Sequence, residues 1–303
     1  MNILLFGRNG RIGWELERTL FTIGHVTALG SKEINLADTD RVKSIIREHA
    51  PSLIVNAAAI SSVDYSQDHV DLTRMVNSLS LKVISEGANR NGAGLIHFSS
   101  DYVFDGTKGS PYTEKDNPSP VNVYGETKLL GDQIVETFCE AYLIIRTSWV
   151  YSLRRDSYLL NILRSINHKK DEISAPVQYG SPTWCRTLAQ IVANILLLRG
   201  HSNIYDFFKR NKGIYNLAGE GGVSRSELVK EVILSIMTNN EKNTPRIKTV
   251  PLDEFFRVKR PLNTILDCSL VKSQFGIEIP TWTTSLALAL DEFGIRLSLG
   301  SSS

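Results

Sequence analysis

Asn2-Ile3-Leu4-Leu5-Phe6-Gly7-Arg8-Asn9-Gly10-Arg11-Ile12-Gly13, near the N-terminus, joins a short apolar run to a glycine-rich turn. The apolar run predicts a buried strand, and residues 14–21 predict an amphipathic helix. Small residues at a strand-to-helix turn let the backbone approach a pyrophosphate, whose charge the helix N-terminus attracts. We therefore predict that the turn binds a dinucleotide, and a plain tight turn is the alternative. The predicted cofactor-binding residues of this turn are Gly7, Arg8, Asn9, Gly10, Arg11, Ile12 and Gly13.

Strands and helices alternate along the first half of the chain. Further strands are predicted at 25–29, 52–55, 95–98 and 142–146, and helices at 40–49, 72–90 and 124–138. Such alternation implies parallel βαβ units, so we expect an α/β fold with a Rossmann-like doubly wound parallel sheet. Beyond residue 151 the pattern is less regular, and a capping box of Ser224 and Glu227 predicts one helix start there.

This change of pattern suggests two domains. We expect residues 1–150 to form an NAD(P)-binding Rossmann domain, to which later segments return. Residues 151–303 are expected to form mainly a smaller C-terminal α/β lobe that binds the substrate.

Composition is that of a globular protein: 303 residues, of which 42% are hydrophobic and 22% charged. The net charge of +2 suggests no nucleic-acid partner. We expect no membrane partner, because no apolar run reaches membrane-spanning length and no signal-like segment is present. Three widely spaced cysteines, Cys139, Cys185 and Cys268, form neither a disulfide framework nor a metal pattern, which fits the reducing cytoplasm.

The end of the second predicted strand bears on the choice of dinucleotide. An acidic residue there would bind the ribose 2′-hydroxyl of NAD, but residues 28–32 contain none. Arg8, Ser31 and Lys32 could instead receive a 2′-phosphate, although each could equally be ordinary surface. We therefore expect NADPH as the cofactor, with NADH also accepted.

Small and polar residues end the next two predicted strands. Asn56, Ala57, Ala58 and Ala59 follow one of them, where ligands lie in open α/β sheets. These small side chains fit either close approach of the cofactor or tight helix–strand packing. Ser100 ends the next strand at the same edge, where its hydroxyl could bond a carbonyl oxygen or cap the following turn.

Tyr124 and Lys128 are four residues apart in a predicted helix, so the phenol and the ammonium lie on one face. A nearby cation lowers the pKa of a phenol and makes it a usable acid or base near neutral pH. Tyr205 and Lys209 share this spacing, so spacing alone decides little. Tyr124 follows the strand that bears Ser100, whereas Tyr205 has no strand edge beside it. We therefore assign catalysis to Tyr124, and packing or surface to Tyr205.

Together, the glycine turn and residues 56–59, 100–104 and 124–128 resemble the extended short-chain dehydrogenases/reductases. Finer marks resemble one family among them, the dTDP-4-dehydrorhamnose reductases. Those marks are Asn122-Val123-Tyr124-Gly125, Arg146-Thr147-Ser148-Trp149-Val150-Tyr151, Gln178-Tyr179-Gly180-Ser181-Pro182-Thr183, residues 213–219 and Arg260-Pro261-Leu262-Asn263-Thr264. The resemblance covers nearly the whole chain.

This resemblance implies NAD(P)H-dependent reduction of the C4 ketone of dTDP-4-dehydro-L-rhamnose to dTDP-L-rhamnose. It makes Tyr124 the general acid, and Lys128 the residue that tunes it and holds the nicotinamide ribose. Ser100 would orient the ketone, Trp149 would line the sugar pocket, and Arg260 would contact the nucleotide diphosphate. The expected catalytic residues are Tyr124, Lys128 and Ser100, and the expected substrate-binding residues are Ser100, Asp101, Tyr102, Trp149 and Arg260.

Several positions depart from related patterns. Sugar-nucleotide dehydratases usually carry an acidic pair after the Ser/Thr, but here Tyr102 follows Asp101, which argues against dehydration. Some family members dimerise through a metal held by glutamates. Glu15 matches one such position, but Arg186 stands where another glutamate is expected, so we predict no metal and no metal-bridged homodimer. Residues 151–156 lack the glycine often found after this strand.

Two further hypotheses stay open at the level of sequence. One is a reductase of another nucleotide 4-keto-6-deoxy sugar. The other is a non-catalytic NADP-binding regulatory subunit, against which the intact set of Ser100, Tyr124 and Lys128 argues.

Overall fold

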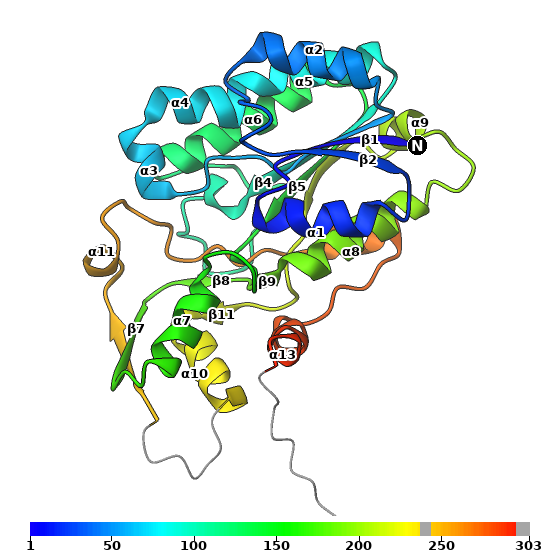
Figure 1. Ribbon diagram of the computed structural model, residues 1–303. Helices are drawn as coiled ribbons and strands as arrows, with labels where there is room; N and C mark the ends of the chain where they lie inside the picture. Colours follow the sequence, from blue (N-terminus) through cyan, green and yellow to red (C-terminus); the bar gives the residue numbers. More distant parts are fainter. Residues whose placement is uncertain (237–243, 295–303) are drawn as a thin grey trace, which may run out of the picture.

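A six-stranded parallel sheet forms the centre of the computed structural model, which describes residues 1–236 and 244–294 (Figure 1). Its strand order is β10-β5-β4-β3-β1-β2. These strands are β1 (Asn2–Phe6), β2 (His25–Leu29), β3 (Leu53–Asn56), β4 (Gly94–Ser100), β5 (Tyr142–Thr147) and β10 (Gly213–Asn216). The strand order reverses between β1 and β3. In α/β sheets, ligands bind at the carboxyl edge of such a switch point. The predicted doubly wound α/β fold is confirmed.

Helices cover both faces of this sheet, which is why its strands are apolar almost throughout. On one face lie α2 (Thr39–His49), α5 (Ser80–Arg90) and α6 (Val123–Phe138), above the sheet in Figure 1. On the other face lie α1 (Arg11–Leu20), α8 (Cys185–Leu197), α9 (Ile204–Arg210) and α12 (Ser269–Phe275). The later elements β10, α8, α9 and α12 therefore pack with the N-terminal part of the chain.

A separate apolar cluster holds a smaller lobe together. Its strand pairs are β6 (Val150–Tyr151) with β9 (Thr183–Trp184), β7 (Glu172–Pro176) with β12 (Arg246–Val250), and β8 (Tyr179–Gly180) with β11 (Val223–Ser224). Its helices are α7 (Tyr158–Asn167), α10 (Arg225–Ile236) and α13 (Trp282–Glu292). The predicted capping box opens α10: Ser224 N donates to Glu227 Oε2 at 3.0 Å, and Glu227 N to Ser224 Oγ at 3.1 Å.

The helix predicted at 72–90 is interrupted. It consists of α4 (Val70–Arg74), a π-helical turn at Met75–Leu79, and α5. Within the π turn, Asn77 Oδ1 accepts from Ile60 N at 2.8 Å, and its backbone oxygen lies against Gly131 of α6. A β-carbon on Gly131 would lie 2.6 Å from that oxygen, so the wider turn and the glycine together let α6 approach closely. Short helices α3 (Val63–Asp68) and α11 (Leu252–Phe255) and a 3-10 turn at Asp101–Val103 complete the described chain. None of its helices meets the length and apolarity needed to span a membrane.

Candidate active site

A cavity of about 310 Å³ lies at the carboxyl edge of the sheet, where the lobe meets it. The sheet side contributes the glycine turn, the segments after β3 and β4, and α6. The lobe side contributes the segment that follows β5, together with residues of α7 and of α10. Among the lining residues are Gly10, Arg11, Ile12, Ala57, Ala59, Ser100, Asp101, Tyr102, Tyr124, Lys128, Trp149, Tyr158, Arg225 and Arg260. The three predicted catalytic residues therefore share one cavity.

The glycine turn is packed so closely that side chains are excluded. Gly7 has φ +91°, and a β-carbon there would lie 2.6 Å from Ala58 N. At Gly13 a β-carbon would lie 2.0 Å from Gly7 O, and Gly10 N donates to Gly7 O at 2.8 Å. This leaves bare backbone at the N-terminus of α1, which fits a dinucleotide pyrophosphate. The backbone of Ala57 and Ala58 packs against Gly7, Asn56 Oδ1 accepts from Ala58 N at 3.2 Å, and Ala57 and Ala59 line the cavity.

Ser100 is held at the end of β4 by its neighbours. Its Oγ donates to Asp101 Oδ1 at 3.0 Å and accepts from Tyr102 N at 3.2 Å. Asp101 Oδ2 accepts from Ser148 Oγ at 2.7 Å. Burial raises the pKa of Asp101, although these hydrogen bonds oppose the rise. Both carboxyl oxygens are thus engaged, and Asp101 orients Ser100 as well as lining the cavity.

Tyr124 lies in the first turn of α6, which Asn122 caps by accepting from Gly125 N at 2.9 Å. Burial raises the pKa of Tyr124 to about 12, and a hydrogen bond with Ser100 and the charge of Arg11 oppose that rise. Our expectation that Lys128 would bring this pKa toward neutrality is wrong, because burial dominates and the Lys128 amine is bonded elsewhere. The phenol therefore remains protonated across neutral pH.

Lys128 lines the cavity, and its buried amine is bonded to groups of β4. Nζ donates to Phe98 O at 2.7 Å and lies 3.3 Å from His97 Nε2. Burial lowers the pKa of Lys128 to about 8. The amine can therefore gain or lose a proton close to neutral pH.

A buried hydrogen-bond chain determines which nitrogen of His97 carries its proton. Ala58 N donates to Asn56 Oδ1 at 3.2 Å, so the Asn56 amide nitrogen, 3.2 Å from His97 Nδ1, is the donor there. Burial and the charge of Lys128 keep the pKa of His97 well below its usual value, so the neutral ring carries its proton on Nε2.

Asp132 and Arg146 extend this buried polar group. Asp132 Oδ2 accepts from Arg146 Nε at 3.1 Å, and Asp132 Oδ1 lies 4.0 Å from His97 Nε2. The two side chains are 0% and 2% exposed, so this ion pair joins α6 to β5 out of contact with water.

The predicted 2′-phosphate residues lie at the end of β2 with an acid among them. Arg8 Nη2 is paired with Glu17 Oε1 at 2.9 Å, while Ser31 and Lys32 are exposed. Glu33, which sequence reasoning missed, folds back so that its Oε2 accepts from Gly30 N at 2.8 Å. A carboxylate therefore does lie at the end of β2, supplied by the residue that directly follows segment 28–32.

Trp149 is built into the cavity wall. Its φ is +41°, and Gly180 makes room for it, since a β-carbon there would lie 2.3 Å from the indole. Tyr102 lies edge-on to Tyr124, with ring centroids 5.8 Å apart. Arg260, which also lines the cavity, pairs through Nη2 with Asp64 Oδ2 at 2.7 Å.

Arg225 is the cavity residue that sequence reasoning missed. Its guanidinium carbon lies 3.4 Å from the centroid of the Trp149 ring and 4.4 Å from that of Tyr158. In the sequence it stands inside the capping box, which predicts only a helix start, so no local signal marked it.

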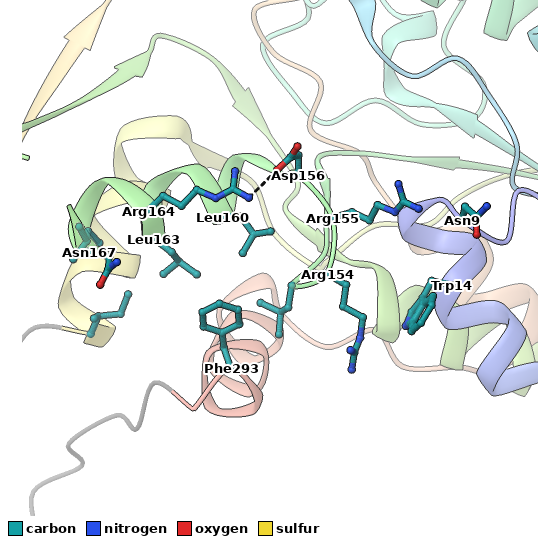
Figure 2. A pocket seen from close by; sticks show the side chains of 13 residues that line it. Asn9, Trp14, Arg154, Arg155, Asp156, Leu160, Leu163, Arg164, Asn167 and Phe293 are labelled. Atoms are coloured by element: carbon teal, nitrogen blue, oxygen red, sulfur yellow. Dashed lines mark ion pairs between the residues drawn. The ribbon is translucent and has the colours of Figure 1, made fainter. Parts of the chain in front are cut away.

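A second, larger hollow of about 1000 Å³ lies away from these residues (Figure 2). Figure 2 shows Asn9 and Trp14 at one end of it, α7 at the other, and Phe293 between them. Of the predicted site residues only Asn9 lines it, and Ser100, Tyr124 and Lys128 do not. We therefore place the chemistry in the smaller cavity.

Other predicted features lie outside the cavity. Tyr205 is on α9, where its hydroxyl donates to Glu140 Oε2 at 2.6 Å. Arg186 bridges two acids, with Nε 3.3 Å from Glu15 Oε2 and Nη2 donating to Glu292 Oε1 at 3.0 Å. Within residues 1–236 and 244–294, no group of three or more His, Cys, Asp or Glu residues could hold a metal ion.

Comparisons with known proteins indicate one family. Residues 1–295 match the family model described as RmlD substrate binding domain. The dTDP-4-dehydrorhamnose reductase of Burkholderia thailandensis is 32% identical over 96% of this chain and 98% of its own length. That of Salmonella typhimurium is 33% identical, with the same coverage of both chains.

Solved structures similar to this one include members of the same family. A dTDP-4-dehydrorhamnose reductase from Clostridium acetobutylicum is 26% identical, covers 97% of this chain and 100% of its own, and superposes with a TM-score of 0.86. One from Bacillus anthracis, solved in complex with NADP, is 25% identical over 96% of this chain and 99% of its own, with a TM-score of 0.84. The chain belongs to the dTDP-4-dehydrorhamnose reductase family, within the extended short-chain dehydrogenases/reductases.

Proposed function

We propose that this protein reduces the C4 ketone of dTDP-4-dehydro-L-rhamnose to dTDP-L-rhamnose with NADPH. Relatives named dTDP-4-dehydrorhamnose reductase are about one-third identical to this chain and align with it over nearly their whole length. A structural neighbour of the same name was solved in complex with NADP. The observation that carries the proposal is the convergence of Ser100, Tyr124 and Lys128 on one cavity beside the glycine turn. A non-catalytic regulatory subunit has no need of this convergence.

We assign each of the main residues that line the cavity a part in the reaction. The reduced nicotinamide supplies a hydride to the ketone carbon. Ser100 bonds the ketone oxygen, and Tyr124 gives its phenolic proton to the oxygen as negative charge develops there. Lys128 holds the nicotinamide ribose and returns a proton to Tyr124. Tyr102, Trp149 and Arg260 contact the nucleotide sugar.

The two domains divide these tasks. We assign cofactor binding to residues 1–150 with the returning segments, and substrate binding mainly to the lobe within 151–303. NADPH contacts Arg8, Ser31 and Lys32. NADH is also accepted, because Arg8 is already paired with Glu17 and the Glu33 carboxylate lies nearby.

We also propose that any homodimer of this chain forms without a bridging metal. Arg186 places a guanidinium between Glu15 and Glu292, which supports this view because that cation would repel a metal ion. A cytoplasmic location is supported by the free thiols of Cys139, Cys185 and Cys268.

Incubation of the protein with NADPH and dTDP-4-dehydro-L-rhamnose tests the proposal. We expect oxidation of NADPH, followed by absorbance, and NMR of the product showing dTDP-L-rhamnose. Tight NADPH binding without oxidation would reject it in favour of a regulatory subunit. Oxidation only with a sugar nucleotide of another base would reassign the substrate.

A further inference from the structure

Arg225 is a cation aimed at the cavity from the lobe. It begins α10, and its guanidinium carbon lies over the ring of Trp149 and over that of Tyr158. Its Nε donates to Gln178 Oε1 at 3.3 Å, and its backbone N donates to Gln178 O at 3.0 Å. The N–H groups of a guanidinium lie in its plane, so those that Gln178 does not engage can bond a ligand at the edge of the group.

No carboxylate neutralises this charge. Within the described chain, Arg225 has no Asp or Glu oxygen within 4.0 Å, whereas Arg260, which lines the same cavity, is paired with Asp64 at 2.7 Å. Asp101 is the nearest acid to influence Arg225, but its oxygens are engaged by Ser100 and Ser148. Tyr102, Tyr158 and Arg260 are the other titratable groups that face Arg225.

An unpaired, partly desolvated cation destabilises a fold unless a ligand compensates it. The Trp149 ring against which Arg225 stacks is itself held in a constrained place. Trp149 has φ +41°, and only a glycine at position 180 leaves room for its indole. A flat guanidinium with covered faces and a free edge suits bidentate bonding to phosphate oxygens. The cofactor pyrophosphate is assigned to the glycine turn on the other side of the cavity, so a second diphosphate is the fitting partner.

We propose that Arg225 binds the diphosphate of the nucleotide-sugar substrate and makes the cavity select a diphosphate over an uncharged nucleoside. This inference rests on the proposed function and adds to it the residue that recognises the substrate's charge. Arg260 then acts as the weaker second cation, because its pairing with Asp64 must be shared.

Calorimetric titration of the full chain with dTDP and with thymidine tests this assignment. For Arg225→Gln we expect the Kd of dTDP to rise about 10- to 100-fold, the range of a lost charge-assisted hydrogen-bond pair, while the Kd of thymidine changes less than about twofold. The matched control is Arg210→Gln, an exposed arginine on α9 that bonds Ser202 Oγ at 3.2 Å, and it should bind both ligands as the parent does.

Parental dTDP affinity in Arg225→Gln would overturn the inference and leave the proposed reduction untouched. Equal losses for dTDP and thymidine would overturn it as well, since they indicate a collapsed pocket rather than a lost charge contact. If Arg225→Gln does not fold, Arg225→Lys decides. It keeps the charge but not the fork, and parental dTDP affinity in it would contradict bidentate bonding. A parent chain that oxidises no NADPH and binds no dTDP would instead reject the proposed function.

Discussion

Tyr124→Phe removes one oxygen from the proposed site, and its effect can be worked out from the structure. Burial holds the pKa of the phenol at about 12, so at neutral pH it carries a proton to donate. A positioned general acid contributes about 10²- to 10⁴-fold, or about 3 to 5 kcal/mol of barrier, so kcat should fall by that factor. KM should change little, because the substrate's nucleotide is held by the lobe. Stability should fall by only about 1 kcal/mol, since Ser100 keeps Asp101 as a hydrogen-bond partner.

The assay is NADPH oxidation under saturating sugar nucleotide, with thermal unfolding measured alongside. Tyr205→Phe is the matched control, because it has the same spacing to a lysine but lies on α9 and bonds Glu140. It should retain parental kcat. A Tyr124→Phe variant within tenfold of the parent would refute the reasoning, because the remaining cavity then supplies a proton without the phenol.

Three further outcomes are expected. Lys128 must be protonated to return a proton, and burial lowers its pKa to about 8. We therefore expect kcat/KM to be level below pH 8 and to fall about tenfold per pH unit above it. A flat profile from pH 7 to 10 would contradict this role of Lys128. Asp132→Asn leaves the buried Arg146 charge unpaired and should destabilise the protein by about 3 to 5 kcal/mol in urea unfolding, against less than about 1 kcal/mol for exposed Glu48→Gln. Glu33→Gln removes a carboxylate at the end of β2 and should raise the ratio of NADPH to NADH turnover, whereas Arg8→Ala should lower it. Unchanged ratios in both variants would place the ribose elsewhere.

Much of the sheet could be predicted because its strands are buried on both faces. Continuous apolar runs such as 2–6 and 142–146 leave little choice but a central strand, and the structure has strands at both places. Positions at strand ends could be predicted for a related reason. Parallel strands bring their carboxyl ends to one edge, so Asn56 and Ser100 had to lie near the glycine turn.

Other features depend on distance through space rather than along the chain. The pKa of Tyr124 could not be predicted from its spacing to Lys128, because four residues on a helix fix proximity but not burial. Arg225 gave no signal, since a residue within a capping box is typical of any helix start, and only the folded lobe brings it against Trp149. The π turn at 75–79 was also invisible, because its cause is the contact of Asn77 with Ile60 and Gly131.

Burial reverses the order of the two key ionisations. In water a tyrosine phenol is slightly more acidic than a lysine ammonium. In this cavity the pKa of Tyr124 is raised to about 12 and that of Lys128 lowered to about 8, so the amine releases its proton first. The phenol then serves as a donor rather than a base in the resting protein, which suits ketone reduction, because the alkoxide left by hydride transfer is a stronger base than phenolate. The reverse reaction would need a phenolate, and the Ser100 hydrogen bond and the charge of Arg11, which would stabilise it, do not outweigh burial. The environment of Tyr124 therefore favours reduction over alcohol oxidation without any change in the residues themselves.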